Sequence, residues 1–377
     1  MPPQPAPRAD GPAPSPDRTQ LTWGPVSWEL HSRDPAEHRW FTEHLSVTGD
    51  HLPYAAPLRS FRIEVRPGPR AAWHIPPRPG PVVLIHDARY HRTALLGRPA
   101  WVRDVGADAV PHAFVRKGRD DWLVLREDHG TDRHGPARPG LLRPAEILAG
   151  ELLNATLAGL GGTTVHASAA HRPTTAPHLP HVSLFSGHSG TGKSTLALAL
   201  AASGGSFIAG DRSVLLPGRD RWHVVGAAVA ARFGRGTLRA AGHAERVGAA
   251  PLLRHGDTAF DALPSPAAKA LLTQTELRRL LETDTSAGGP LARIVLLQRS
   301  TRKTPTVTAV PPDEAAAMLQ PHLLPTFAPW WERSSAPSDR SMTRLPVPAL
   351  LVRWDPLTHP AATVLRLMDR AGPSPKT

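Results

Sequence analysis

The sequence has 377 residues, a formal net charge of +12 and no cysteine. This length predicts about two domains plus tails and is enough to bury a sizeable core. The lack of cysteine excludes disulfides and thiolate chemistry within the chain and suits a reducing compartment. No apolar run approaches the length of a membrane span, and the first residues lack the apolar core of a signal peptide. We therefore expect a cytoplasmic protein with no membrane partner.

The positive charge alone would suit a nucleic-acid partner, but its distribution argues against one. Arginines are spread along the chain and do not gather in one run or on one helix face. Aromatic residues make up only 5% of the chain, which leaves few surfaces on which single-stranded bases would stack. We therefore do not expect nucleic-acid binding to be the main role.

The first part of the chain predicts a tail followed by a β-rich domain. Residues 1–20 are mostly proline, alanine and polar residues, which cannot bury enough apolar area to order themselves, so we expect a disordered tail. Residues 21–140 form the predicted β-rich domain. It contains no catalytic motif, so it either supports the second half of the chain or recognises a protein or peptide partner.

Several segments of this domain have the patterns of regular structure. Phe61, Ile63 and Val65 alternate with charged residues, as in a half-buried strand. Two short apolar runs predict buried strands, and an earlier segment predicts one short helix; in that order, they are residues 82–85, residues 122–125 and residues 35–45.

The second half, residues 141–377, predicts an α/β domain. Residues 144–160 predict a helix that has Pro144 in its first turn and one broad apolar face. Residues 163–170 predict a strand that carries His166 and that precedes, or lies beside, the next strand at residues 182–185.

The central motif follows that strand. It fits the pattern of glycine, any four residues, glycine, lysine, then serine or threonine, and consists of Gly187, His188, Ser189, Gly190, Thr191, Gly192, Lys193 and Ser194. An apolar strand precedes it and an alanine- and leucine-rich helix follows from Thr195. In such a loop the backbone N–H groups and the helix N-terminus hold the phosphates of ATP. Lys193 would reach the β and γ phosphates, and the hydroxyl of Ser194 would bind Mg²⁺.

A carboxylate suited to the same metal follows the motif. Phe207, Ile208 and Ala209 predict a strand that leads to Gly210 and Asp211. An apolar strand that ends in aspartate commonly places its carboxylate near a nucleotide-bound Mg²⁺. We therefore expect Ser194 and Asp211 to be the metal ligands.

Downstream, three arginines lie in a glycine-rich stretch, and the rest of the chain predicts an α/β extension. Arg232, Arg235 and Arg239 are candidates for holding a phosphate or an acidic acceptor, although solvent-exposed arginine is the commoner outcome. The predicted elements are a helix from Ser265 to Leu281 that restarts at a capping box on Thr273, strands at 294–297 and 350–352, and helices at 312–319 and 361–368.

The strand with His166, the glycine motif and the acidic turn form a set that resembles the catalytic domain of HPr kinase/phosphorylase and its relatives, including kinase-like proteins of modified-peptide pathways. The resemblance covers residues 163–242. It implies a P-loop kinase domain that binds ATP and Mg²⁺, which here follows the predicted N-terminal β-rich domain. It also implies that His166 lies near the transferred phosphate and that Asp211 is the second of two adjacent aspartates, on the metal side.

The sequence departs from that family at two positions. Gly210 stands where the family has its first aspartate, the proposed catalytic base. Thr195, which we include among the nucleotide-binding residues, replaces a glutamate that is frequent in the HPr enzymes, so HPr itself is a doubtful acceptor. Either Asp211 or His166 then accepts the proton of the attacking hydroxyl, or activity is weak or lost.

Two functions follow from these residues. The preferred one is an ATP-dependent, Mg²⁺-assisted serine kinase that acts on a protein or peptide, with His166, Lys193 and Asp211 as catalytic residues. The alternative is a nucleotide-binding regulatory or scaffold protein with little or no kinase activity. The sequence leaves the acceptor, the choice of ATP or GTP, and a homo-oligomeric state open.

Overall fold

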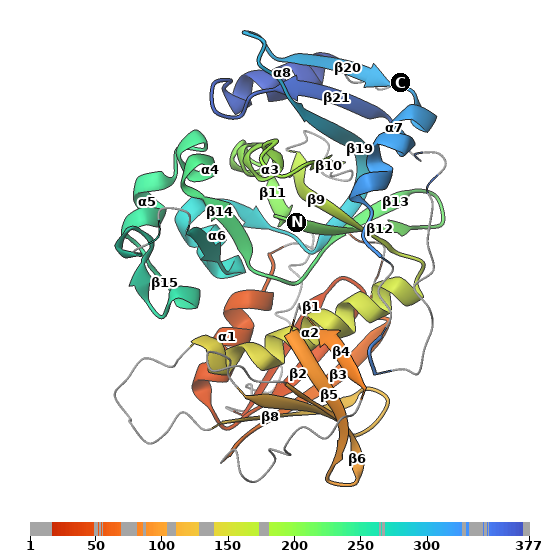
Figure 1. Cartoon of the computed structure of the whole chain (residues 1–377), viewed down its shortest axis with the longest axis vertical. Helices are drawn as coiled ribbons and strands as arrows, with labels where there is room; N and C mark the ends of the chain where they lie inside the picture. The colour runs from red at the N-terminus through yellow and green to blue at the C-terminus, as the bar shows by residue number, and fades with distance from the viewer. Residues whose placement is uncertain are drawn as a thin grey trace, which may run out of the picture.

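The computed structural model describes residues 17–48, 52, 54, 56–68, 81–85, 88–103, 111–127, 139–172, 181–263, 265, 268–325, 329–331, 342, 345 and 347–371. It is a mixed α/β structure with several sheets (Figure 1). Most of the predicted tail, residues 1–16, lies outside the described residues. None of the described helices is long and apolar enough to cross a membrane.

The first half of the chain forms an eight-stranded sheet in the order β1-β2-β3-β8-β7-β6-β5-β4. Its strands are β1 (Arg18–Trp23), β2 (Val26–His31), β3 (Arg59–Gly68), β4 (Val82–Ile85), β5 (Ala88–Leu95), β6 (Arg98–Arg103), β7 (His112–Arg116) and β8 (Asp121–Glu127). The three residues Arg18, Thr19 and Gln20, which the sequence assigned to the tail, pair with β2. The predicted buried strand β4 is instead an edge strand, and its Leu84 is 70% exposed.

Two helices, α1 (Pro35–Leu45) and α2 (Pro139–Gly159), pack on this sheet. The structure confirms the predicted bounds of α1, which Asp34 caps by accepting a hydrogen bond from the N–H of Ala36. Helix α2 begins earlier than predicted, so Pro144 lies inside it and not in its first turn. A proline there forfeits one backbone hydrogen bond, to the carbonyl of Gly140, while the apolar face of the helix stays in the core.

The second half forms a nine-stranded sheet in which β10 (His181–Gly187) is an interior strand. It pairs with β9 (Thr163–Arg172) in antiparallel and with β19 (Gly288–Arg299) in parallel orientation. The other strands are β11 (Ser206–Ala209), β12 (Arg212–Pro217), β13 (Trp222–Gly226), β18 (Asp284–Thr285), β20 (Thr306–Val310) and β21 (Ala349–Trp354). The pairings β9–β10–β19–β13–β12–β9 close a circuit, so the apolar residues along these strands face a shared interior.

Helices cover both faces of this sheet. Those on the side of the candidate site are α3 (Lys193–Ala202), α4 (Arg235–Ala240), α5 (Ala244–Ala249), α6 (Gln274–Leu281) and α8 (Ala361–Ala371), and α7 (Pro312–Leu319) packs on the other side. Between them lie the short strands β14 (Ala231–Gly234), β15 (Pro251–Leu252), β16 (Thr258–Ala259) and β17 (Lys269–Leu272), and the 3₁₀ turns η2 (Leu253–His255), η3 (Phe260–Ala262) and η4 (Gln320–His322).

The predicted helix from Ser265 is wrong in its first part. Residues 269–272 form β17, which pairs with β14, and Ala270 and Leu272 are fully buried while Lys269 and Leu271 are not. This alternation suits a strand. The helix proper, α6, follows Thr273, where the structure confirms the predicted capping box.

The two halves pack against each other. The indole N–H of Trp23 in β1 donates to the carbonyl of Gly226 at the end of β13, a buried hydrogen bond of 3.0 Å. Val214, Leu216 and Val225 of the second sheet belong to the same apolar cluster as the core of the first sheet. This shared cluster fixes α2 beside the turn that carries Asp211.

Candidate functional site

Residues 187–194, hereafter the glycine loop, connect β10 to α3. Helix α3 begins at Lys193, and Gly192 is its N-cap residue with φ of 88°. The first turn of a helix leaves N–H groups without partners inside the helix, and these suit an anion. The order of strand, glycine loop and helix that the sequence predicted is therefore present in space, and Ser189 and Gly190 are exposed at its tip.

Trp354, at the end of β21, supports the glycine loop from beneath. Its indole N–H donates to the carbonyl of Thr191 over 2.8 Å, and the ring is fully buried. A Cβ on Gly192 would lie 2.3 Å from this ring, so only glycine fits both the left-handed backbone and the close approach. Sequence analysis missed Trp354, because its strand lies 160 residues downstream and carries no motif.

The side chain of Lys193 is folded back onto the glycine loop. Its ammonium donates to the carbonyls of Gly187 and His188 at 2.9 and 3.1 Å, and the residue is 6% exposed. Burial lowers its pKa, Asp211 opposes this, and Lys269 lowers it further. The charge is thus held by loop carbonyls, beside the carboxylate of Asp211.

Three polar groups join β9, α3 and the turn before β12. The hydroxyls of Ser168 and Ser194 both donate to the carbonyl of Gly210, at 2.6 and 2.9 Å, and lie 3.2 Å from each other. Ser168 is two residues beyond His166 on the same strand, so both side chains are on one side of β9. The two-residue spacing from His166 could have indicated Ser168 from the sequence, but Ser168 was not among the predicted site residues.

His166 and Asp211 contact each other at the same place. Nε2 of His166 is 3.3 Å from a carboxylate oxygen of Asp211, and the two side chains are 38% and 53% exposed, so a substrate can reach both. Burial lowers the pKa of His166 and the charge of Lys193 lowers it further, whereas Asp211 raises it. The net direction is downward, so the imidazole is mostly neutral at neutral pH.

Two other predicted residues contact different partners. Thr195 is buried, and its hydroxyl lies 3.3 Å from that of Thr237 in α4. His188 packs edge-on against His322 of η4, with ring centroids 5.0 Å apart. Sequence analysis missed His322, which reaches the glycine loop because the residue after it, Leu323, bridges to β9.

The three downstream arginines have different surroundings. Arg235 forms an ion pair with Asp261 and stacks over Phe260, 4.2 Å from its ring centroid. Arg239 is exposed on α4. Arg232 lines a pocket that Asp211 also lines, so it is the one of the three that lies beside the candidate centre.

Among the described residues, no three histidine, aspartate or glutamate side chains gather as a metal site. Among the described residues, the oxygen ligands that the sequence predicted are the hydroxyl of Ser194 and the carboxylate of Asp211, and the hydroxyl of Ser168 lies beside that of Ser194. Mg²⁺ commonly takes one or two carboxylates and fills its other positions with water and nucleotide phosphates. This donor set therefore fits Mg²⁺ held jointly with a nucleotide and does not fit a metal held by protein alone.

Comparisons with known proteins add little. No family model and no curated protein matches the sequence. Among solved structures, the chain is similar to the HPr(Ser) kinase/phosphatase from Coxiella burnetii, with 11% sequence identity and a TM-score of 0.28, over 55% of this chain and 88% of that one. This is a weak similarity of fold and says nothing about activity.

Proposed function

We propose that this chain is an ATP-dependent kinase that phosphorylates a serine hydroxyl of a protein or peptide. The observation that carries the proposal is the meeting of the glycine loop with the pair formed by His166 and Asp211, both beside Lys193. Phosphoryl transfer needs little covalent participation from a protein and depends on positioning and on positive charge. Such a site supplies both.

In this proposal each residue has one task. Lys193 exchanges its bonds with the loop carbonyls for bonds with the β and γ phosphates of ATP. Ser194 and Asp211 hold Mg²⁺, which supplies charge neutralisation between the phosphates. His166, neutral at physiological pH, orients the acceptor hydroxyl or takes its proton, because Gly210 offers no carboxylate for that task.

The first prediction concerns Lys193. Replacing it by methionine removes charge-assisted hydrogen bonds and should weaken binding of MgATP by roughly 10- to 100-fold, the equivalent of one or two such bonds. Calorimetric titration of the full chain with MgATP measures this. The same substitution at Lys303, an exposed lysine in the turn before β20, is the matched control and should change nothing. Equal affinity for MgATP in the wild type, in Lys193→Met and in Lys303→Met would overturn the proposal.

A regulatory or scaffold function is the second candidate, and Gly210 favours it. A chain that binds nucleotide but lacks a carboxylate base at this turn would give heat in the titration and no transfer of labelled phosphate to serine peptides. Transfer that is lost in both Lys193→Met and Asp211→Asn supports the kinase over the scaffold.

A further inference from the structure

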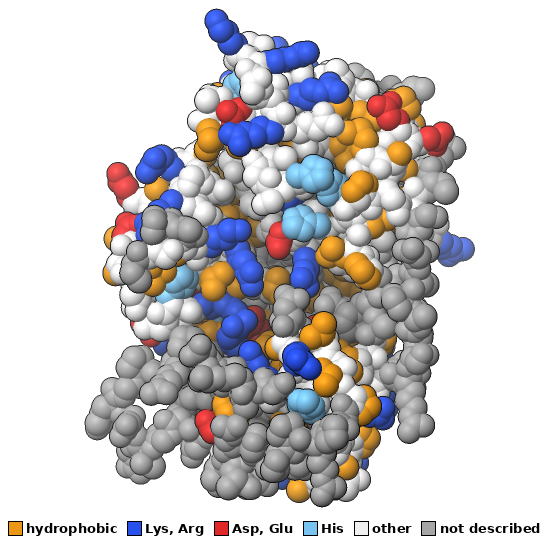
Figure 2. Space-filling view, viewed as in Figure 1, with side chains coloured by type: hydrophobic (Ala, Val, Ile, Leu, Met, Phe, Trp, Pro, Cys, Tyr) orange, Lys and Arg blue, Asp and Glu red, His pale blue; other side chains and the backbone are white. Residues whose placement is uncertain are grey.

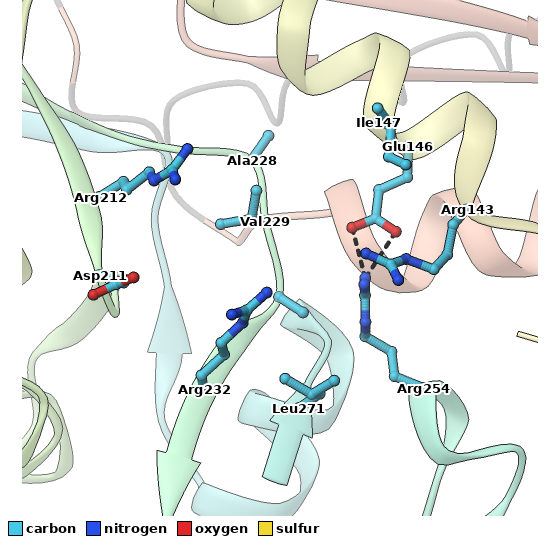
Figure 3. Close-up of a pocket in the computed structure, with 11 residues that line it drawn as sticks. Arg143, Glu146, Ile147, Asp211, Arg212, Ala228, Val229, Arg232, Arg254 and Leu271 are labelled. Carbon is cyan, nitrogen blue, oxygen red and sulfur yellow. Dashed lines mark hydrogen bonds and ion pairs between the residues drawn. The ribbon is translucent and has the colours of Figure 1, made fainter. Parts of the chain in front are cut away.

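A second group of charged residues lies next to the candidate centre, and all of them except Asp211 have no role in the proposed transfer. It lines a pocket of about 140 Å³ between α2, η2, β14 and the beginning of β12 (Figure 3). The charged residues of this pocket, hereafter the arginine pocket, are Arg143, Glu146, Asp211, Arg212, Arg232 and Arg254. Figure 2 shows lysine and arginine side chains along the hollow in the middle of this face of the molecule.

One of the four arginines is already neutralised. Arg254 forms two hydrogen bonds with the carboxylate of Glu146, at 2.6 and 2.8 Å, and both side chains are almost fully buried. Glu146 also accepts the indole N–H of Trp40 at 3.1 Å. The closest partners of this carboxylate are therefore Arg254 and Trp40, and among the described residues it forms no ion pair with the other three arginines of the pocket.

The other three arginines carry uncompensated charge. Among the described residues, none of Arg143, Arg212 and Arg232 lies within ion-pair distance of a carboxylate, and the one remaining acidic residue of the pocket, Asp211, contacts His166. Burial lowers the pKa of the Arg143 guanidinium, Arg254 lowers it further and Glu146 raises it. Arg143, Arg212 and Arg232 are exposed to solvent, which weakens the repulsion between them, and a bound anion would relieve what remains.

The size of the arginine pocket limits what it holds. Pockets for drug-sized ligands and cofactors measure roughly 300–1,000 Å³, several times this volume. A single carboxylate or phosphate group fits, and guanidinium groups bind both through paired hydrogen bonds. The pocket is also adjacent to the proposed chemistry, since Arg212 follows Asp211 and pairs in register with His166 across β12 and β9.

We infer that the arginine pocket binds an anionic group, a carboxylate or a phosphate, of the acceptor and so positions the neighbouring serine beside Asp211. This inference rests on the proposed kinase function for the identity of the acceptor. The substrate class is then a serine peptide with an acidic or phosphorylated residue close to the serine.

The test uses three fluorescent peptides that contain one serine and differ at the next position, which is glutamate, phosphoserine or glutamine. Fluorescence anisotropy measures their binding to the full chain saturated with MgADP. We expect at least one of the two anionic peptides to bind roughly tenfold or more tightly than the glutamine peptide, as one or two charge-assisted bonds allow. The better of the two identifies the anion as carboxylate or phosphate.

Variants separate this pocket from general attraction to a positive chain. Arg232→Gln and Arg143→Gln should each remove most of the preference, whereas Arg239→Gln, which makes the same charge change on exposed α4, should keep it. Thermal unfolding checks that each variant is folded. Equal binding of the three peptides, or equal loss in Arg232→Gln and Arg239→Gln, would overturn the inference. Binding of MgATP is measured separately and tests the proposed function. A failure of the arginine pocket to select anionic peptides is therefore distinguishable from a failure of the proposed function.

Discussion

At the scale of single residues, Gly210 determines how the proposed chemistry proceeds. Its carbonyl accepts hydrogen bonds from the hydroxyls of Ser168 and Ser194, so on the side of residue 210 these bonds involve only the backbone. A Cβ at this position would meet its nearest neighbours, Phe207 and Ala231, at 3.6 and 3.7 Å, which is ordinary contact. Space therefore does not require glycine here, and a side chain can be introduced.

Gly210→Asp should increase phosphate transfer, because it places a carboxylate next to Asp211 where a base is missing. General base catalysis is typically worth roughly 10²–10⁴-fold, and we expect at least about tenfold in the rate of transfer from labelled ATP to serine peptides. Gly210→Asn has the same size without the basic oxygen and is the control. If both variants gave the same rate, a missing base would not be what limits the enzyme.

At the scale of elements, α6 shows how a local sequence device fixes the structure beside the site. The hydroxyl of Thr273 accepts the N–H of Glu276 at 3.1 Å, and the carboxylate of Glu276 accepts the N–H groups of Thr273 and Leu253 at 2.9 and 2.7 Å. One glutamate thus closes the N-terminus of α6 and also holds η2, which carries Arg254 into the arginine pocket.

Thr273→Ala should lower the free energy of unfolding by about 1–2 kcal/mol, because it removes a buried N-cap acceptor. Urea denaturation measures this, with an unchanged dependence on urea concentration showing that the unfolded state is the same. Thr301→Ala, at an exposed position after β19, is the control and should change stability by less than about 0.5 kcal/mol. An equal effect of both substitutions would mean that the capping box contributes nothing special.

At the scale of the whole molecule, a buried polar network joins the two halves. Trp40 and His44 of α1, Glu146 of α2 and Arg254 of η2 meet there, and His44 stacks on Trp40 with ring centroids 4.4 Å apart. His44 is almost fully buried. Burial lowers its pKa to about 4, although Glu146 partly opposes this.

The pKa of His44 predicts a loss of stability in mild acid. Because the folded-state pKa is lower than that of an unfolded histidine, near 6.5, the unfolded chain takes up a proton first as the pH falls. The contribution of His44 to the free energy of unfolding is complete above pH 6.5 and is lost between about pH 6.5 and pH 4. The loss from pH 7 to pH 5 is about 2 kcal/mol. Burial raises the pKa of Glu37 to about 7, and this carboxyl stabilises the fold more at pH 5 than at pH 7, so the two effects oppose each other. Urea denaturation of the wild type and of His44→Gln at both pH values isolates the His44 contribution as the difference between the two proteins.

His44→Gln should remove the contribution of His44 from this part of the pH dependence, since it removes the group that titrates. His38→Gln, on the same helix, controls for the removal of a histidine and should leave the slope as it is in the wild type. If the free energy of unfolding changed with pH in His44→Gln as it does in the wild type, another group would be its cause.

The sequence by itself determined the local elements. The bounds of α1, the capping box at Thr273 and the order of strand, glycine loop and helix follow from neighbours in the chain, because apolar spacing, caps and glycines act over a few residues. Where local patterns were ambiguous the predictions failed: β17 was taken for a helix, and Val82–Ile85 was taken for a buried strand.

Only the tertiary structure decided which distant residues share the site. Trp354 lies under Gly192, Ser168 bonds to Gly210, His322 packs on His188, and Arg143 and Arg232 enter one pocket. These residues are brought together by strand pairing and by an apolar core shared between the two sheets. Such contacts depend on the packing of the whole chain, and no short stretch of sequence encodes them.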